Sequence, residues 1–461
     1  VDFHFPGQKE IRIMSPEFPV KTLQPFNLLN LIEQVDKEPP YLTFTAFLWS
    51  MSGKVCFRNM KVAAIKGFAD ILPGETETWQ FVEDKAREVF ARYNFSEIRI
   101  PILEKTELFS RSLGETTDIV EKEMYSFADQ DAKGSLLTLR PEGTAGVVRA
   151  YVEAELYQTE PVRKLFYLGP MFRREKPQKG RLRQFYQIGA EVLGRGDPLA
   201  DAELLLLLRD FFESVGLDGL TLELNSLGCV ECRARYRREL LAFLKEREKE
   251  LCANCQRRME RNPLRVLDCK EESCLKLTEG APSILGFLCQ ACEDHFGGVK
   301  ELLGGTRLDF KLNPRMVRGL DYYCRTAFEW TSSRLGSQNA VAAGGRYDGL
   351  VEDLGGPPTP GVGFAMGMER LVLLLGLKGA REAARPGLYL VWVGAKARAW
   401  AFPVVHRLRR RGFNAEMEGE EKSLKSQMRR ADKLRARFVL IVGDEELKSG
   451  RGILRDMGSK E

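Results

Sequence analysis

The chain alternates between segments whose apolar residues recur every three or four positions and segments in which every second residue is apolar. The first pattern predicts amphipathic helices, and the second predicts half-buried strands. The clearest helical segment runs from Thr78 to Tyr93, with apolar positions at Trp79, Val82, Ala86, Val89 and Phe90. A second, strongly apolar helix is predicted over residues 201–217, and a third begins near Thr144.

Strand-like segments lie between these helices. "SEIRIPILE", residues 96–104, alternates as far as Pro101, which has no amide proton and is expected to end the strand or lie at an edge. "KLFYLGPMFRRE" and "QFYQIGAEVLG" are two strand-like runs joined by the polar "KPQKGRLR", which is the pattern of a long hairpin. "LTLELNSLG", "AVAAGGRYDG" and "GVGFAMGMERL" add strands and tight turns. Together these segments predict an antiparallel sheet with helices.

The two ends of the chain and one internal segment differ from this pattern. The first sixty residues have no periodic helices, and Met60 stands where the character changes, so we expect either an upstream translated extension or a small extra domain. The cysteine-rich segment after residue 228 is mostly helical and interrupts strand-type sequence, which indicates an insertion. Beyond "AARPGL", at residues 383–388, the order strand, helix, helix, strand predicts a small α/β domain. Pro403 weakens its first helix locally.

Composition excludes several classes of protein. A chain of 461 residues with 44% hydrophobic residues is expected to fold into two to four domains. Its 70 basic and 65 acidic residues give a net charge of only +5, so any nucleic-acid site must be local. No apolar run is long enough for a transmembrane helix, and no basic segment precedes the early apolar stretch as in a signal peptide. We therefore expect no membrane partner and a cytoplasmic location.

Eight of the ten cysteines lie between Cys229 and Cys292. They form four close pairs: Cys229–Cys232, Cys252–Cys255, Cys269–Cys274 and Cys289–Cys292. In a cytoplasmic protein such spacing favours structural Zn²⁺ over disulfides, although reduced thiols buried on helices are the alternative. The sequence alone does not commit to a metal, and the zinc content of the purified protein would decide.

The predicted hairpin carries the first candidate site. Arg173 at the end of one strand is suited to phosphate oxygens, because a guanidinium can pair with two of them. Phe185, Gln187 and Glu191 on the returning strand are an even number of residues apart, so they share one face of the sheet. A ring, an amide and a carboxylate on one surface suit a nucleotide and a polar small molecule. The alternative is an amphipathic hairpin with a solvated face.

Three further segments point to the same chemistry. "RGLDYY" places Arg318 close to Tyr322 and Tyr323, and "AGGRYDG" has glycines where a backbone must come close to another group. Arg370 lies in the first turn of a predicted helix, where a cation is disfavoured by the helix dipole, so a base or a phosphate is its expected partner. There is no Walker or dinucleotide glycine motif. His4, His295 and His406 are scattered, and we expect them at the surface.

Several motifs in order resemble the bacterial-type histidyl-tRNA synthetases, a family of class II aminoacyl-tRNA synthetases. They are "GFADILPGE", "LTLRPEGT", "GPMFRREKPQKGRLRQFYQIGAE", "NPLRVLDCK", "VRGLDYYCRTAFEW", "AAGGRYDGLV" and "GVGFAMGMERL". The resemblance implies an α+β fold with an antiparallel class II sheet, a mostly helical insertion domain and a C-terminal α/β anticodon-binding domain. It also implies a homodimer, with the helix and strand that end at Pro101 at the interface.

The resemblance implies ATP-dependent ligation of L-histidine to histidine tRNA, through a histidyl-adenylate and with Mg²⁺ accompanying the pyrophosphate. Arg173 would hold the α-phosphate, Phe185 and Arg370 would enclose the adenine, and Arg318 would stabilise the developing charge. The residues implied to bind histidine are Glu142, Gly143, Thr144, Arg173, Gln187, Glu191, Arg318, Tyr322 and Tyr323. Glu191 and Tyr323 would meet the two imidazole nitrogens. Gln178, Lys179 and Arg181 would face the acceptor end of the tRNA.

The implied domains are an extension over residues 1–59, a catalytic core in two parts (60–228 and 304–384), the cysteine-rich insertion (229–303) and the anticodon-binding domain (385–461). The extension has no counterpart in the family, and the last domain ends earlier than the family pattern, so we expect its anticodon recognition or stability to be affected. Two alternatives remain: a regulatory subunit of ATP phosphoribosyltransferase, which shares the catalytic fold, and a plain nucleic-acid-binding protein.

Overall fold

The computed structural model of the chain describes residues 63–459, except 115–116, 118, 130–133, 179, 337–338 and 377–384. Before residue 63 it describes only the backbone of four short strands, β1 (Asp2–Phe3), β2 (Ile11–Arg12), β3 (Leu48–Trp49) and β4 (Val55–Cys56). The chain divides into two units, Val1–Ala63 and Ala64–Glu461. Met60 and most of the expected extension therefore lie outside the described residues.

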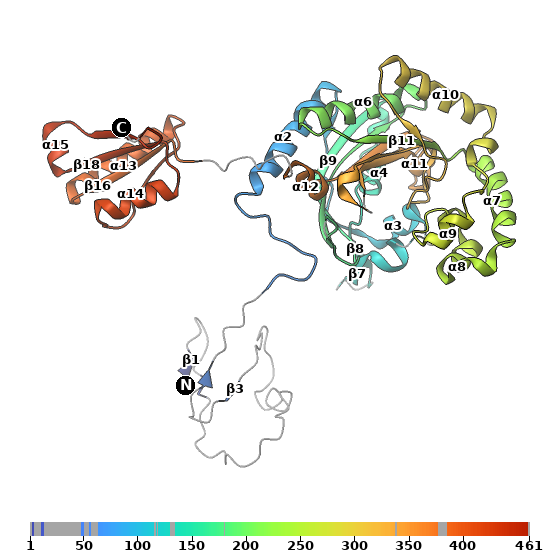
Figure 1. The fold of residues 1–461 in the computed structure, drawn as a ribbon, viewed down its shortest axis with the longest axis horizontal. Coiled ribbons are helices and arrows are strands. Elements are labelled where there is room, and N and C mark those ends of the chain that lie inside the picture. Colours follow the sequence, from blue (N-terminus) through green and yellow to red (C-terminus); the bar gives the residue numbers. More distant parts are fainter. Residues whose placement is uncertain are drawn as a thin grey trace, which may run out of the picture. The chain divides into compact units, whose positions relative to one another are not determined.

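An eight-stranded sheet forms the centre of the second unit (Figure 1). Its strands, in spatial order, are β12 (Lys311–Leu312), β11 (Thr221–Ser226), β13 (Cys324–Thr331), β14 (Ala340–Arg346), β15 (Gly361–Gly367), β10 (Gln184–Leu193), β9 (Arg163–Phe172) and β5 (Ser96–Glu97). Only the two edge pairs, β12 with β11 and β5 with β9, are parallel. The predicted antiparallel sheet and the β9–β10 hairpin are confirmed.

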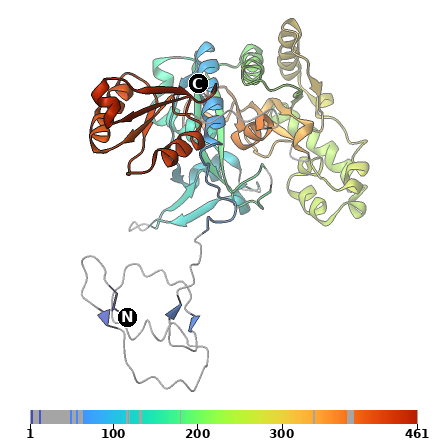
Figure 2. The same ribbon diagram turned by 60° about the vertical axis from the view of Figure 1, so that its left-hand side comes forward.

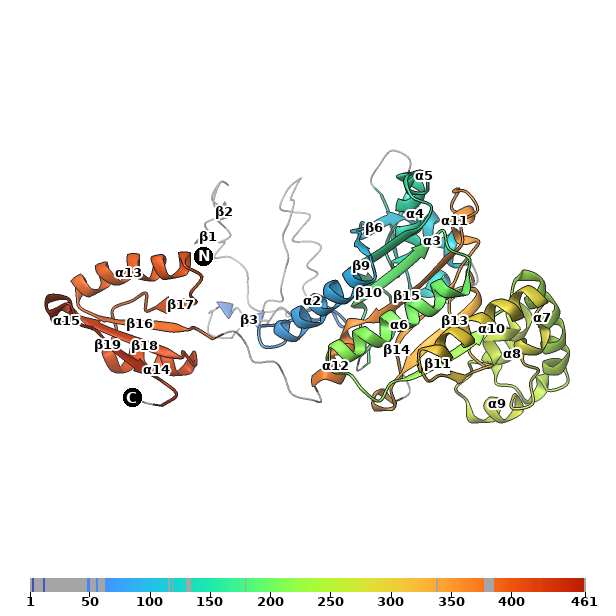
Figure 3. The ribbon, with the colours of Figure 1, turned by 90° about the horizontal axis from the view of Figure 1, so that it is seen from above.

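Helices cover both faces of this sheet. The helices α2 (Thr76–Arg92), α6 (Pro198–Ser214), α10 (Gln290–Gly305) and α12 (Met368–Gly376) share one apolar core with the sheet. Figure 3 shows α2, α6 and α10 along that face. β10 contributes Ile188, Ala190 and Val192 to this core. The alternate residues of β10 therefore face the other side, where α4 (Thr144–Glu153) packs.

A small three-stranded sheet lies beside the hairpin strands and consists of β6 (Leu103–Lys105), β8 (Leu136–Leu139) and β7 (Tyr125–Ala128). The helix α3 (Thr106–Leu113) follows β6 directly. The strand predicted from residue 96, with Pro101 at its end or edge, is shorter than expected, because β5 ends at Glu97 and a separate strand, β6, begins at Leu103. Between them the guanidinium of Arg140 takes the place of a neighbouring strand and donates to the carbonyl oxygens of Ile100 at 2.7 Å and Pro101 at 3.3 Å.

The chain between β11 and α10 is mostly helical. It contains α7 (Val230–Lys245), α8 (Ala253–Arg261) and α9 (Glu272–Leu277), joined by short 3₁₀ turns. These three helices, yellow-green in Figure 2, form a group with its own small apolar core. We call residues 229–289 the helical insertion below.

The C-terminal region has its own four-stranded sheet in the order β17 (Ala415–Met417), β16 (Leu388–Val393), β18 (Phe438–Gly443) and β19 (Ile453–Asp456). Its helices are α13 (Ala395–Arg410), α14 (Leu424–Lys433) and α15 (Asp444–Ser449). The predicted α/β domain is confirmed, with β17, α15 and β19 in addition, and α13 continues through Pro403. Within the described residues, every helix is too short or too polar to cross a lipid bilayer.

Candidate active site

A cavity opens on the α4 side of the central sheet, between the β9–β10 loop, β14, β15 and the first turn of α12. The predicted site residues that line it are Glu142, Thr144, Arg173, Arg181, Phe185, Gln187, Arg318, Tyr322, Tyr323 and Arg370. They come from segments as far apart as residues 142 and 370, so the tertiary fold brings nearly the whole predicted set together.

Glu142 lies at the turn between β8 and α4. Its carboxylate accepts the backbone N–H groups of Thr144 and Ala145, both at 2.8 Å, so it caps the helix as well as lining the cavity. Burial raises the pKa of this carboxyl, because the charged form loses its hydration. Gly143 is needed between β8 and α4, since a Cβ there would lie 2.3 Å from the ring of Tyr167.

Glu191 lies on the same face of β10 as Gln187 but does not line the cavity. It is fully buried, and one carboxylate oxygen accepts the hydroxyl of Thr144 at 2.7 Å while the other accepts the hydroxyl of Tyr347. Burial raises its pKa to about 8, against the hydrogen bonds from Tyr347 and Thr144, which lower it. Gly363 on the neighbouring strand makes room for it, because a Cβ there would lie 1.7 Å from the carboxylate.

Two buried polar atoms at the cavity are without a hydrogen-bond partner among the described residues: Oε1 of Gln187 and Nε of Arg318. The rest of the Arg318 guanidinium is held in place, with Nη1 2.5 Å from a carboxylate oxygen of Glu329 and the group stacked 5.2 Å from the ring centre of Tyr323. Burying such groups unpaired is costly, so their presence in a cavity indicates a ligand with a complementary acceptor and donor.

An aromatic wall stands next to Arg318. The rings of Tyr322 and Tyr323 lie 4.6 Å apart and tilted, and Tyr322 is 5.7 Å from Tyr347. Tyr323 is buried, whereas Tyr322 is half-buried. Burial raises the pKa of both phenols, so they remain neutral hydroxyl groups that can donate a hydrogen bond.

The other half of the cavity is rich in arginine. The guanidinium of Arg173 stacks 5.2 Å from the ring centre of Phe185, and its Nε donates to the carbonyl of Pro141 at 2.8 Å. Arg370 donates to the carbonyl of Ala340 on β14, which gives this first-turn cation a protein partner. Glu369 beside it accepts the N–H of Tyr186 at 2.9 Å and so attaches α12 to β10. Burial raises the pKa of Glu369 to about 7.

The polar side chains of the β9–β10 loop point partly into the cavity and partly to the protein surface. Arg181 is half-buried, pairs with the buried Glu175 and lines the cavity, whereas Lys176 and Gln178 are exposed. The backbones of Gln178 and Arg181 form a tight turn by pairing with each other at 2.9 and 3.0 Å. Lys179 lies outside the described residues.

One histidine departs from its predicted position. His295 on α10 is buried rather than at the surface, because α10 packs against α6. Its Nε2 lies 3.7 Å from Asp201, which pairs with the fully buried Arg346, and burial lowers the pKa of the imidazole. His406 is exposed as expected, and His4 lies outside the described residues. His295 is buried and is not among the residues that line the cavity.

Sequence reasoning missed Tyr347, Glu329, Glu369 and Gly363. Three of them act on a predicted residue: Tyr347 holds Glu191, Glu329 holds Arg318, and Gly363 makes room for Glu191. Glu369 lines the cavity itself. Tyr347 lies within "AGGRYDG" and Gly363 within "GVGFAMG", so the motifs marked the right segments. Which side chain of each segment points inward was not readable from the spacing.

An antiparallel sheet of this order, with a strand-end arginine and a phenylalanine on one side of a cavity and a helix-borne arginine on the other, is the architecture of class II aminoacyl-tRNA synthetases. Fold and cavity together therefore define an enzyme of that class.

Comparisons with known proteins narrow the class. Residues 67–371 match the protein family described as Histidyl-tRNA synthetase, and residues 388–461 match the family described as Anticodon binding domain. A protein of Syntrophotalea carbinolica named histidine–tRNA ligase is 55% identical over 404 residues, which cover 87% of this chain and 96% of that protein. One of the same name from Geobacter sulfurreducens is 56% identical over 396 residues, which cover 86% and 95%. The chain belongs to the histidyl-tRNA synthetase family.

Comparison with solved structures agrees with this family assignment. The apo histidyl-tRNA synthetase of S. aureus superimposes with a TM-score of 0.73 at 34% identity, covering 87% of this chain and 96% of that one. A Bacillus halodurans structure titled ATP phosphoribosyltransferase regulatory subunit/histidyl-tRNA synthetase has a TM-score of 0.61 at 19% identity, covering 84% and 100%, and so shares the fold alone. The resemblance found in the sequence is confirmed, and the chain is an aminoacyl-tRNA synthetase.

Proposed function

We propose that this cavity is where the chain, as a histidine–tRNA ligase, joins L-histidine to ATP and passes the histidyl group to histidine tRNA. In the first step a carboxylate oxygen of histidine attacks the α-phosphorus of ATP, and pyrophosphate leaves. In the second, the terminal adenosine of the tRNA attacks the histidyl carbonyl, and AMP leaves. The observation that carries the proposal is the pair of unpartnered buried atoms, Gln187 Oε1 and Arg318 Nε, within a cavity lined by Glu142 and Tyr323.

Histidine would bind at the end of the cavity near α4. Glu142 and Gln187 offer acceptors to the α-amino group, with Gly143 and Thr144 forming the wall of the turn. Tyr323, and Glu191 beneath it, would take the two imidazole nitrogens, with Tyr322 closing the pocket. Each oxygen of Glu191 accepts one hydrogen bond from protein, and a carboxylate oxygen has capacity for a second. A pocket that pairs both ring nitrogens rejects other amino acids by factors of about 10⁴, because its buried groups would be left unpaired.

ATP would occupy the arginine-rich half. Arg173 would hold the α-phosphate, and Phe185 and Arg370 would enclose the adenine. Arg318 would offer Nε to the charge that grows on the α-phosphate and carboxylate, which accelerates the step because the donor is held in place beforehand by Glu329. Mg²⁺ prefers oxygen ligands, and the carboxylate of Glu369 lies at this end, where the metal would neutralise pyrophosphate.

We propose that Gln178, Lys179 and Arg181 meet the acceptor end of the tRNA, since Gln178 is exposed on a loop whose other side lines the cavity. The domain division that accompanies this function is a catalytic core over 60–228 and 304–384, an insertion over 229–303 that contacts tRNA, and an anticodon-binding domain over 385–461. The compartment we propose is the cytoplasm, where tRNA, ATP and reduced thiols occur together.

A homodimer is part of the proposal. The small sheet and the segment at Pro101 expose large apolar side chains, namely Ile102 (43% exposed), Leu103 (39%), Phe127 (48%) and Leu136 (56%). Apolar side chains gathered in this way are typical of a subunit interface. Analytical ultracentrifugation of the full chain should give the mass of two copies, and replacing Phe127 and Leu136 by serine should shift it toward one.

The decisive experiment is histidine-dependent exchange of ³²P-labelled pyrophosphate into ATP by the full chain. We expect exchange with L-histidine and Mg²⁺, and none above background with other amino acids at the same concentration. Folded protein that catalyses no exchange with histidine would refute the proposed reaction. Aminoacylation of histidine tRNA, measured with the same preparation, then tests the second step separately.

A further inference from the structure

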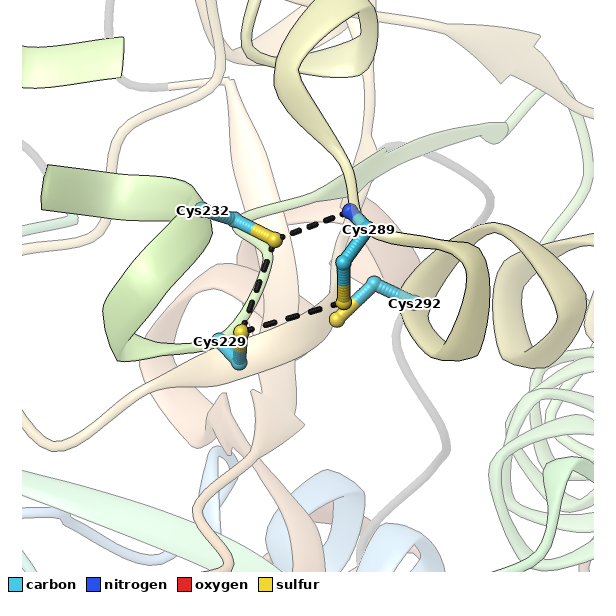
Figure 4. Close-up of side chains that lie close together, drawn as sticks. All are labelled: Cys229, Cys232, Cys289 and Cys292. Carbon is cyan, nitrogen blue, oxygen red and sulfur yellow. Dashed lines mark hydrogen bonds between the residues drawn. The ribbon is translucent and has the colours of Figure 1, made fainter. Parts of the chain in front are cut away.

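The eight cysteines of residues 229–292 converge into two separate groups of four. The first group joins Cys229 and Cys232 to Cys289 and Cys292, which are about sixty residues away in the sequence (Figure 4). The second joins Cys252 and Cys255 to Cys269 and Cys274. Within each group all four sulfur atoms lie within 4.8 Å of one another. None of these residues belongs to the active-site cavity, so its chemistry leaves them unexplained.

The sulfur positions suit one central metal ion rather than disulfides. In the first group the sulfurs of Cys229 and Cys232 are 3.5 Å apart, and those of Cys229 and Cys289 are 4.0 Å apart. A disulfide needs about 2.05 Å, and the nine cysteines in the described part of the chain are free thiols. Four thiolates placed about 2.3 Å from a tetrahedral Zn²⁺ lie about 3.8 Å from each other, which is the spacing seen here.

The backbone around the sulfurs supplies hydrogen-bond donors. Cys229, Cys252 and Cys289 are the N-cap residues of α7, α8 and α10, where the first backbone N–H groups of a helix have no partner within the helix. Backbone N–H groups point at two further sulfurs: Cys289 donates to Cys232 at 3.1 Å, and Cys252 donates to Cys274 at 3.3 Å. Such outer hydrogen bonds orient metal ligands.

We propose that each group binds one Zn²⁺ through four thiolates, which release their protons as the metal binds. The site of Cys229, Cys232, Cys289 and Cys292 is named the junction site, and that of Cys252, Cys255, Cys269 and Cys274 the inner site. Tetrahedral sulfur coordination also suits iron. Zinc is favoured because all four sulfurs surround a single point, whereas an iron–sulfur cluster needs room for inorganic sulfide among its irons.

The junction site ties together the two places where the helical insertion leaves and rejoins the sheet. Cys229 is the third residue after the end of β11, and Cys292 lies in the first turn of α10, which returns to the core. The chain next to this site is hydrogen-bonded to the segment that carries Tyr322 and Tyr323. The backbone N–H of Arg325 donates to the carbonyl of Gly228 at 2.9 Å. The side chain of Arg233 donates to the carbonyl of Tyr323 at 3.0 Å. The junction site therefore positions that segment.

The inner site lies within the apolar core of the helical insertion, where a bound metal would add to the stability that apolar packing provides. Cys255, Cys269 and Cys274 are themselves members of the small core of the helical insertion. Short helices with so few apolar neighbours gain most of their stability from cross-links, and a structural zinc supplies one without a disulfide. The proposal rests on these groups alone and does not depend on the proposed reaction.

The test measures zinc per chain by inductively coupled plasma mass spectrometry on the full-length protein, purified reduced and without a metal-binding tag. We expect two zinc ions per chain. The double variant Cys229→Ser/Cys232→Ser should retain one, and Cys252→Ser/Cys255→Ser should retain one. Cys324→Ser, a cysteine outside both groups, is the matched control and should retain two. Less than one zinc in the unmodified chain, or stoichiometric iron in its place, would overturn the proposal.

A second measurement works even if the variants fail to fold. The unmodified chain, produced in medium with Co²⁺ in place of Zn²⁺, should show the near-ultraviolet sulfur-to-cobalt bands and the visible bands of tetrahedral thiolate coordination. Cobalt-loaded protein without these bands would rule out four-thiolate sites. Unmodified chain that holds a single zinc would overturn one of the two, and the variant that then loses all zinc identifies which site was real.

Discussion

The central sheet and the helical insertion are stabilised in opposite ways. The sheet buries a continuous apolar core to which α2, α6, α10 and α12 all contribute, with Leu205 and Phe364 among its most buried members. The helical insertion has a separate, smaller core of eleven buried residues, of which three are cysteines. The difference teaches that a small segment can hold a fixed shape beside a large domain without a large core, provided that something cross-links it.

Their contributions to the active site differ in the same way. The residues that line the cavity come from the central sheet, from loops next to it, and from the first turns of α4 and α12, whereas the insertion contacts the loop before β13. Arg265 donates to the carbonyl of Gly319 at 2.8 Å, and Arg315 donates to the carbonyl of Thr278 at 2.6 Å. The insertion therefore holds one wall of the cavity in position.

The largest expected effect separates the stability of the two regions. In Cys252→Ser/Cys255→Ser the insertion should unfold while the sheet stays folded, because a structural zinc contributes on the order of 10 kcal/mol to such a segment. Limited proteolysis followed by mass spectrometry should then show rapid cleavage between residues 246 and 283, with the sheet resistant. A cleavage pattern identical to that of the unmodified chain would contradict the role given to the inner site.

The next effect tests where the chemistry lies. Arg318→Ala should slow histidine-dependent pyrophosphate exchange at least about a hundredfold, roughly 2.7 kcal/mol, and leave histidine binding less affected, because the contact strengthens in the transition state. Arg334→Ala, an exposed arginine of the same region, is the matched control and should exchange at the normal rate. Normal exchange in Arg318→Ala would remove the assigned role.

A third prediction concerns the ionisable carboxyl group of Glu191, which is buried next to the proposed histidine pocket. Burial raises the pKa of Glu191 from 4.5 to about 8, so the folded state holds the proton more tightly than the unfolded state. The resulting stabilisation is complete below about pH 4.5 and is lost as the pH rises toward 8. Between pH 5 and 8 the free energy of unfolding should fall by on the order of 2 kcal/mol relative to Glu191→Gln, which cannot titrate. A constant difference in denaturant titrations at pH 5, 6.5 and 8 would contradict this.

The smallest effect probes the contact between the regions. Arg233→Ala removes the hydrogen bond to the carbonyl of Tyr323 and should raise KM for histidine about threefold to tenfold, roughly 1 kcal/mol, with KM for ATP unchanged. Arg237→Ala, one turn further along α7, is the control, since that arginine donates to the carbonyl of Arg261 within the insertion. Equal KM values for histidine in the two variants would show that the insertion does not position the tyrosine loop.

Much of the fold was predictable because periodic patterns report local structure. The helix predicted over Thr78–Tyr93 is α2, Thr76–Arg92, and α4 begins at Thr144 as expected. The hairpin of β9 and β10 and the shared face of Phe185, Gln187 and Glu191 follow from alternation alone. The strand expected up to Pro101 is shorter in the structure, because the side chain of Arg140, forty residues from Ile100, satisfies the backbone carbonyls there in place of a neighbouring strand.

By itself, the sequence determined the family and the sheet-and-helix pattern, since motifs and periodicity are properties of neighbouring positions, and it singled out the residues proposed to carry the chemistry. Only the tertiary structure decided which groups meet. Tyr347, 156 residues from Glu191, holds that carboxyl under the pocket, and His295 is buried against Asp201. Four cysteine pairs in a row could combine in several ways. The fold joins the outer two pairs and the inner two pairs, because α7 and α10 begin side by side where the insertion meets the sheet.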